Sequence, residues 1–135
     1  MSEENVELGH RVFEGVNRSG FDGMLPFLDP QVEWHTDPSV PEPGVYRGRE
    51  GVADYVRGLF SLTGGTVRFE VERIVSIPGD RIFCQVTAYS TPEGSGREVA
   101  LMDWCLIGTV HQGRIAAIHS YLRLDEALEA AGLSE

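Results

Sequence analysis

Asp103 is the acidic residue whose setting in the sequence best suits chemistry, because it stands in a stretch that is otherwise apolar. Strand alternation would place Leu101, Cys105 and Ile107 on the same face as this carboxyl group. Burial among apolar side chains raises the pKa of a carboxyl group and suits it to general acid or base work. We therefore predict that Asp103 faces a pocket and moves a proton. The alternative is an open face of the sheet, where the carboxylate would pair with an arginine.

Two histidines and one further acid are the other catalytic candidates. His35 and Asp37 lie close together at the end of a predicted strand, and His119 lies on the last predicted strand. An imidazole with an unperturbed pKa of about 6.5 can carry a proton near neutral pH. His119 could pair with Asp103 across neighbouring strands and act as a base oriented by a carboxylate. The alternative that we favour for His119 places it on the outer face of the sheet, so that Ile118 would line the interior.

Aromatic residues and one cysteine would shape an apolar pocket around these groups. The candidate substrate-binding side chains are Trp34, Tyr46, Tyr55, Phe60, Cys105 and Tyr121. The aromatic residues could equally fill the core or form the rim of the pocket. A nucleophilic role for Cys105 is not expected, because a neighbouring carboxylate would raise the pKa of its thiol.

The composition excludes several classes of function. The chain has 135 residues, with 21 acidic residues against 11 basic residues, and its formal net charge is −10. This charge argues against a nucleic-acid or anionic-membrane partner, since both attract a basic surface. All 11 basic residues are arginines, so Schiff-base chemistry and a phosphate-binding P-loop, which need lysine, are excluded. The four histidines lack metal-binding spacing and the sequence has no dinucleotide-binding glycine motif, so neither a metal nor a cofactor is expected.

The location and the domain count are also predicted from the sequence. The first residues are acidic and lack the apolar segment of a signal peptide, and no apolar run approaches the roughly 20 residues that span a bilayer. Cys84 and Cys105 are not spaced as a redox or metal pair, so we expect reduced, buried thiols and a cytoplasmic protein. A bridge between the two cysteines is the alternative. No repeat or linker divides the chain, which predicts one domain over residues 1–135.

Hydrophobic periodicity predicts helices in the first part of the chain and a sheet afterwards. Helices are expected over 2–19, over 21–28 with a stop at Asp29-Pro30, from 48 to about 64, and over 124–131. Strands are expected over 32–36, 67–77, 82–89, 99–110 and 115–122. The 67–77 strand is expected to bury its apolar residues, from Val67 to Ile77, on one face. This order is typical of an α+β domain in which a strongly bent sheet, wrapped on a long helix, closes one cavity.

The order of the elements and two segments resemble a known superfamily. The segments are Val32-Glu33-Trp34-His35 and Gly44–Val52. Together they resemble the nuclear-transport-factor-2-like (NTF2-like) superfamily, and within it the SnoaL-like polyketide-cyclase and ketosteroid-isomerase branch. The resemblance covers nearly the whole chain. It implies a cone-shaped fold, in which N-terminal helices pack on a strongly curved, mostly antiparallel β-sheet enclosing a pocket, and a homodimer that pairs through the exposed sheet face.

The resemblance also bears on the site residues. In the isomerase branch the catalytic base lies at the end of the first strand, and this sequence offers either Trp34 or Asp37 at that position. The tyrosine that the isomerases supply from the first helix has no counterpart among the apolar residues Val12, Phe13 and Val16. Without that hydroxyl, stabilisation of a steroid-type enolate is not expected.

Three functions remain open, and the third of them is a pure oligomerisation module, which predicts a filled cone with no cavity. The leading hypothesis is a cofactor-independent enzyme that isomerises, cyclises or hydrates an apolar or polyketide-like small molecule, with Asp103 moving the proton. The alternative is a non-catalytic module that holds a small apolar ligand. The alternative predicts a cavity lined mainly by carbon, with no acid–base pair within hydrogen-bonding reach, which is about 2.6–3.2 Å.

Overall fold

The structure is a computed structural model of the chain and describes residues 2–40, 43–61 and 65–134. Its elements in chain order are α1 (Ser2–Ser19), η1 (Phe21–Phe27), β1 (Leu28–His35), β2 (Val45–Arg47), α2 (Gly48–Phe60), β3 (Gly65–Ile77), β4 (Arg81–Pro92), β5 (Val99–His111), β6 (Arg114–Tyr121) and α3 (Leu124–Ala131). The predicted end of the second long helix at residue 64 lies outside the described residues. The remaining predicted elements are present, although several begin or end at different residues.

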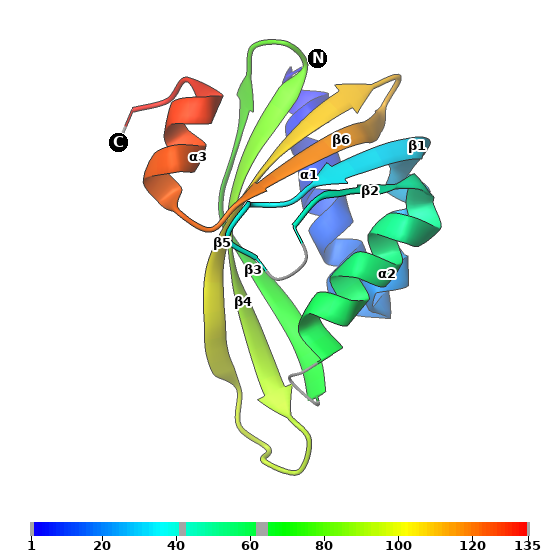
Figure 1. Cartoon of the computed structure of the whole chain (residues 1–135), viewed down its shortest axis with the longest axis vertical. Helices are drawn as coiled ribbons and strands as arrows, with labels where there is room; N and C mark the ends of the chain where they lie inside the picture. Colours follow the sequence, from blue (N-terminus) through cyan, green and yellow to red (C-terminus); the bar gives the residue numbers. More distant parts are fainter. Residues whose placement is uncertain (1, 41–42, 62–64, 135) are drawn as a thin grey trace.

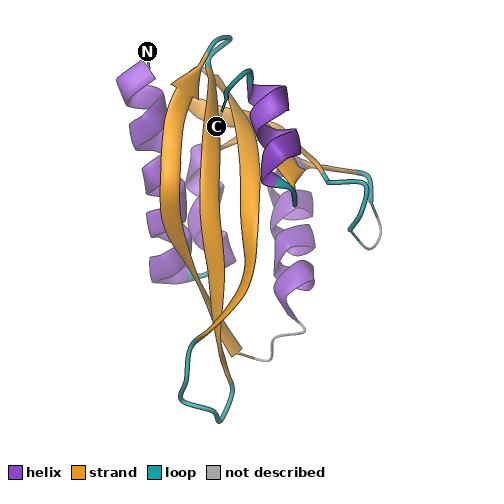
Figure 2. Cartoon of the chain, turned by 90° about the vertical axis from the view of Figure 1, so that its left-hand side faces the viewer, coloured by secondary structure: helices purple, strands orange, loops and turns teal. Residues whose placement is uncertain are grey.

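Six strands form one mixed sheet in the order β2-β1-β6-β5-β4-β3. The β1–β6 pair is parallel, and the other neighbouring strands that the structure describes are antiparallel. Figure 1 shows α1 and α2 on the concave side of this twisted sheet and α3 on the opposite side, which faces the viewer in Figure 2. The predicted α+β architecture, with N-terminal helices on a curved and mostly antiparallel sheet, is confirmed.

The main core lies between the concave face of the sheet and the helices. In α1, Phe13 and Val16 are buried, as expected for residues three positions apart on one helical face. The close approach of α1 to η1 requires glycine, because a Cβ atom on Gly15 would lie 2.4 Å from the carbonyl oxygen of Gly23. This contact holds η1 against α1, so that Met24 of η1 is buried in the main core.

A second, smaller core lies on the outer face of the sheet under α3. Phe83, Cys105 and Ile107 from the sheet pack there against Ala127 and Leu128 of the helix. The strand β5 therefore has apolar residues on both faces, one set for each core. This arrangement decides where the candidate site residues point.

A bulge in β3 changes which of its residues face the main core. The pairing with β4 shifts between Val71 and Arg73, and an extra residue in a strand reverses the alternation beyond it. Phe69 and Ile74 accordingly belong to the main core, whereas Ile77 belongs to the core under α3. The prediction that the apolar residues of this strand share one face was wrong for that reason.

The first strand also differs from the prediction. It begins at Leu28 and includes Pro30, which the sequence suggested as a helix stop. Pro30 has no backbone N–H to donate, but it lies where the pairing with β6 is irregular, between Leu28 and Glu33. The short strand β2 was not predicted, since three residues carry too little periodicity. No described helix is long and apolar enough to cross a membrane.

Candidate functional site

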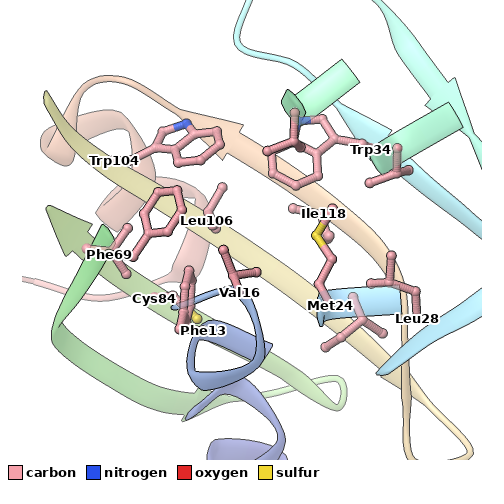
Figure 3. Packing of buried hydrophobic residues seen from close by; sticks show 14 of the residues in the cluster. Phe13, Val16, Met24, Leu28, Trp34, Phe69, Cys84, Trp104, Leu106 and Ile118 are labelled. Atoms are coloured by element: carbon pink, nitrogen blue, oxygen red, sulfur yellow. The ribbon is translucent and has the colours of Figure 1, made fainter. Parts of the chain in front are cut away.

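A small cavity of about 60 Å³ lies between α1, η1 and the concave face of the sheet. Figure 3 shows the side chains that converge on this region. The residues that line the cavity are apolar or glycine: Gly9, Val12, Phe13, Phe21, Met24, Leu28, Trp34, Val56, Phe69, Ile82, Cys84, Trp104, Leu106, Gly108, Ile115 and Ile118. The surface of the cavity is therefore almost entirely carbon and sulfur.

Aromatic rings form one wall of the cavity. The ring centroids of Trp34 and Trp104 lie 5.4 Å apart, and those of Trp104 and Phe69 lie 6.1 Å apart. Phe60 supports these rings edge-on, 5.5 Å from Phe69 and 5.6 Å from Trp104. Such separations are the favourable range for aromatic pairs, so this wall is a packed cluster.

Two glycines on facing elements leave the space open. A Cβ atom on Gly108 of β5 would lie 3.4 Å from Ile82 and 3.7 Å from Ile115, which is ordinary contact distance. A Cβ atom on Gly9 of α1 would lie 3.0 Å from the side chain of Ile82. A methyl group therefore fits at position 108 at ordinary contact distance, whereas at position 9 the side chain of Ile82 would have to move.

The polar groups near the cavity are poor acids and bases. Burial, followed by the charge of Cys105, raises the pKa of the Cys84 thiol to about 12, so the thiol stays protonated at neutral pH. The indole Nε1 of Trp34 is a buried donor with no hydrogen-bond partner in the described part of the chain. Both cysteines are free and buried, as expected, and the bridge considered as the alternative is absent.

Asp103 does not face the cavity, and its predicted placement was wrong. It is exposed, and its carboxylate accepts a hydrogen bond of 3.1 Å from Thr87 Oγ1. Its neighbour Trp104 points into the cavity instead. The apolar face that Asp103 shares with Cys105 and Ile107 is real, but α3 covers it from outside. The carboxylate lies beyond that cover, on the outer face of β5.

The two histidines come together, but on the outer face as well. His35 and His119 are partners in the parallel β1–β6 register, and their rings stack with centroids 4.2 Å apart. The predicted pairing of His119 with Asp103 does not occur, since His119 is paired with Ile107 on β5. The alternative position for His119 is the observed one, with Ile118 lining the cavity.

Asp37 is a structural carboxylate at the end of β1. It is only 5% exposed, and Oδ1 accepts hydrogen bonds from Ser39 N at 2.9 Å and Ser39 Oγ at 2.7 Å. Oδ2 accepts one from Leu122 N at 2.9 Å, which ties this loop to the end of β6. Burial raises the pKa of Asp37, but these hydrogen bonds outweigh it and the pKa is lowered overall. A carboxylate held in this way is a weak general acid or base.

The predicted binding residues fall into three groups. Trp34 lines the cavity. The ring of Tyr55 lies against the ring of Trp34, with the two centroids 6.0 Å apart. Tyr46 stacks on Tyr55 at 4.2 Å, one layer further from the cavity. Cys105 and Tyr121 are partners on the outer face under α3, so their predicted position in the pocket was wrong. Phe60 stands behind the lining aromatic residues.

Most lining residues were not singled out from the sequence as site residues. Phe13, Phe21 and Met24 come from α1 and η1, and their apolar character is that of any core residue. Gly108 in the middle of a strand was the usable signal, because a glycine there often marks a close approach or a space. No group of three histidine, cysteine, aspartate or glutamate residues within the described ranges could hold a metal ion.

Comparison with known proteins agrees with this geometry. The family model for the SnoaL-like domain matches residues 10–118. The chain belongs to the SnoaL-like domain family. Among curated proteins, none matches the sequence significantly.

Solved structures with the same fold as this SnoaL-like domain cover nearly the whole chain. Bal32a, from a soil-derived mobile gene cassette, has 18% sequence identity and a TM-score of 0.74, with 96% of each chain covered. TerC, solved with polyporic acid, has 18% identity and a TM-score of 0.70, covering 95% of this chain and 97% of TerC. A protein from Catenulispora acidiphila with a ketosteroid-isomerase-like fold, in complex with trimethylamine, has 12% identity and a TM-score of 0.67. The match covers 95% of this chain and 94% of the Catenulispora acidiphila protein.

Proposed function

We propose that this SnoaL-like domain is a binding module that holds a compact, uncharged, apolar molecule in its cavity and performs no acid–base chemistry there. The observation that carries the proposal is the lining of the cavity, in which every residue is apolar or glycine. A ligand in such a site is bound by contact with carbon and by its exclusion from water.

The position of the ionisable candidates supports a non-catalytic role. A general acid or base must lie within hydrogen-bonding reach of the atom it serves. His35 and His119 are on the opposite face of the strands that carry Trp34 and Ile118 into the cavity. Asp103 is exposed, and Asp37 is engaged by three hydrogen bonds. This arrangement favours the binding module over an isomerase, cyclase or hydratase.

The volume of the cavity limits the size of the ligand. An engineered cavity of roughly 150 Å³ lined by aliphatic and aromatic residues binds benzene or xenon, whereas this cavity measures about 60 Å³. A ring of six carbon atoms is therefore too large unless side chains move. Burial of a charge without a polar partner is strongly unfavourable, which argues for a neutral ligand.

Structures with the same fold support small-molecule binding in general. TerC was solved with polyporic acid, and the Catenulispora acidiphila protein was solved with trimethylamine. The second of these ligands is a compact molecule of the size class proposed for this cavity.

The proposal is tested by titration with xenon, a compact apolar probe, followed by amide chemical shifts in two-dimensional NMR spectra. We expect a saturable response at the cavity residues in the wild type and in Gly58→Ala. Gly58 is a matched control because a Cβ atom there has no neighbour within 4 Å. In Gly108→Ala, whose new methyl group occupies the cavity, we expect the affinity to fall at least about ten-fold. Absence of saturable binding to the wild type, or equal binding to Gly108→Ala, would contradict the proposal.

A further inference from the structure

The outer face of the β1–β6 pair carries two histidines whose rings lie flat on each other. The centroids of His35 and His119 are 4.2 Å apart and the ring planes differ by 4°. The two residues are direct partners in the register of these parallel strands. A charge on either ring therefore affects the β1–β6 pairing, which joins β1 to β6 in the sheet.

Within the described part of the chain, one carboxylate contacts the rings, and it is already shared. His35 Nε2 lies 3.2 Å from Glu33 Oε1, and since a carboxylate can only accept, this nitrogen carries the proton and donates. The other oxygen of Glu33 accepts from Arg47 Nε at 3.2 Å. Glu33 can stabilise one positive ring next to it, but it is divided between that ring and a guanidinium group.

The other groups around the pair do not compensate a second positive charge. Burial, the neighbouring His35 and the positive Arg81 lower the pKa of His119, and Glu33 opposes them. In the adjacent strand β5, the residue paired with His119 is the uncharged Ile107. Among the residues that the structure describes, the ionisable groups around the pair are Glu33 on β1, Arg47 on β2, Arg81 on β4 and Tyr121 on β6, with Asp37 and Glu126 beyond Tyr121.

The same two strands form part of the cavity wall. Trp34 and Ile118 directly precede the two histidines, are partners in the same register, and line the cavity on the opposite face. Any separation of β1 from β6 at the histidines therefore also separates two lining residues.

We propose that protonation of both His35 and His119 weakens the β1–β6 pairing and opens the cavity in acid. Two positive rings stacked at 4.2 Å repel each other, whereas one neutral ring and one hydrogen-bonded to Glu33 do not. The consequence for binding rests on the proposed function: a ligand held while at least one ring is neutral is released when both rings are protonated.

The pairing is tested by native-state hydrogen exchange of the β1 and β6 amides at pH 7.5 and 5.0, with each rate referred to the intrinsic rate of the unfolded chain. The amides of β3 and β4 serve as an internal reference. In the wild type we expect the opening equilibrium of β1 and β6 to rise at pH 5.0 by at most about five-fold, the ratio for two unit charges about 4 Å apart in water, because Glu33 still stabilises one of the two rings. His119→Gln and His35→Gln should each abolish the rise. His111→Gln is the control, because His111 is exposed at the end of β5 and is not part of the stacked pair. This variant should behave as the wild type. A rise that persists in both test variants, or no rise in the wild type, would overturn the proposal.

The link to the cavity is tested separately with xenon at the same two pH values. Faster xenon exchange at pH 5.0 in the wild type, but not in His119→Gln, would support acid opening. Equal exchange in both proteins would overturn the link. If xenon bound at neither pH, the proposed function would fail, whereas the amide exchange would still decide whether the histidine pair controls the β1–β6 pairing.

Discussion

Replacement of Asp37 by asparagine distinguishes a structural carboxylate from a catalytic one. The two carboxylate oxygens accept three hydrogen bonds, from Ser39 N, Ser39 Oγ and Leu122 N. Asparagine has one acceptor oxygen, so its NH₂ group must face either the Ser39 or the Leu122 N–H group. In either orientation two donors oppose each other in a site that is 5% exposed, and at least one hydrogen bond is lost.

The expected loss of stability follows from the number of hydrogen bonds. A hydrogen bond to a charged group contributes about 1.5–3 kcal/mol, and a buried donor left unpaired costs about 1–3 kcal/mol. We therefore expect Asp37→Asn to lower the free energy of unfolding by about 2–3 kcal/mol, measured by urea denaturation at pH 7. Asp80→Asn is the matched control: Asp80 is exposed in a turn with φ of 52°, a conformation that asparagine also adopts. Its effect should stay within about 0.5 kcal/mol.

The pH dependence of the same variant gives an independent result. Because the pKa of Asp37 is lowered on folding, its ionised form stabilises the protein above the pKa of the unfolded chain. This stabilisation is lost only as the pH falls below about 4 and through the folded-state pKa. The difference between wild type and Asp37→Asn should therefore be constant from pH 7 to pH 5. Equal stability of the two proteins at pH 7, or a difference that already shrinks above pH 5, would refute the structural role.

Four further predictions follow from the same geometry. Gly108→Ala should stabilise the protein by about 1 kcal/mol in urea denaturation, because one buried methyl group contributes about 0.8 kcal/mol. The upper limit of the gain is about 1.4 kcal/mol, the value for filling all 60 Å³ of the cavity at 24 cal/mol per Å³. A loss of stability would contradict an open space there. Asp103→Asn should leave the affinity for xenon unchanged and alter the free energy of unfolding by less than about 0.5 kcal/mol. A large change in xenon affinity would show that Asp103 belongs to the binding site. Cys84, with its pKa raised to about 12, should react with iodoacetamide at pH 7.5 only as fast as the protein unfolds, and labelling of the folded state would contradict its burial. Light scattering at micromolar concentration should show a homodimer, as the family resemblance implies, and a monomer would exclude it.

The order of the elements could be predicted from the sequence because their periodicity is strong. Residues such as Phe13 and Val16 mark a helical face, and alternation in β4 and β6 marks half-buried strands. Irregularities were not predictable in the same way. The bulge after Val71 reverses a face without changing the local pattern, and Pro30 is accommodated by an irregular pairing that only the neighbouring strand determines.

The placement of Asp103 shows why the site was harder to predict than the fold. Alternation in β5 separates two sets of residues, and both sets are apolar. The set with Trp104 and Leu106 lines the cavity, whereas the set with Cys105 and Ile107 lies under α3. Periodicity identifies the two faces, but it carries no information on which face a distant helix covers. Asp103 was assigned to the wrong one for that reason.

The contact between the two histidines also could not be predicted from the sequence. Their outward position follows from alternation once Trp34 and Ile118 are placed inside. Their mutual contact depends on the parallel register of β1 and β6, which are separated by most of the chain. No spacing within the sequence specifies that register, so the stacked pair could be found only in the structure.

The central claim is that the concave face of this SnoaL-like domain encloses an apolar cavity able to hold a compact molecule. The most direct measurement is the anomalous scattering of xenon in a crystal of the wild-type protein under xenon pressure. We expect one well-occupied xenon atom among Met24, Leu28, Ile82 and Ile118, and its loss in Gly108→Ala. Absence of xenon from this position at saturating pressure, or ordered water in its place, would contradict the claim.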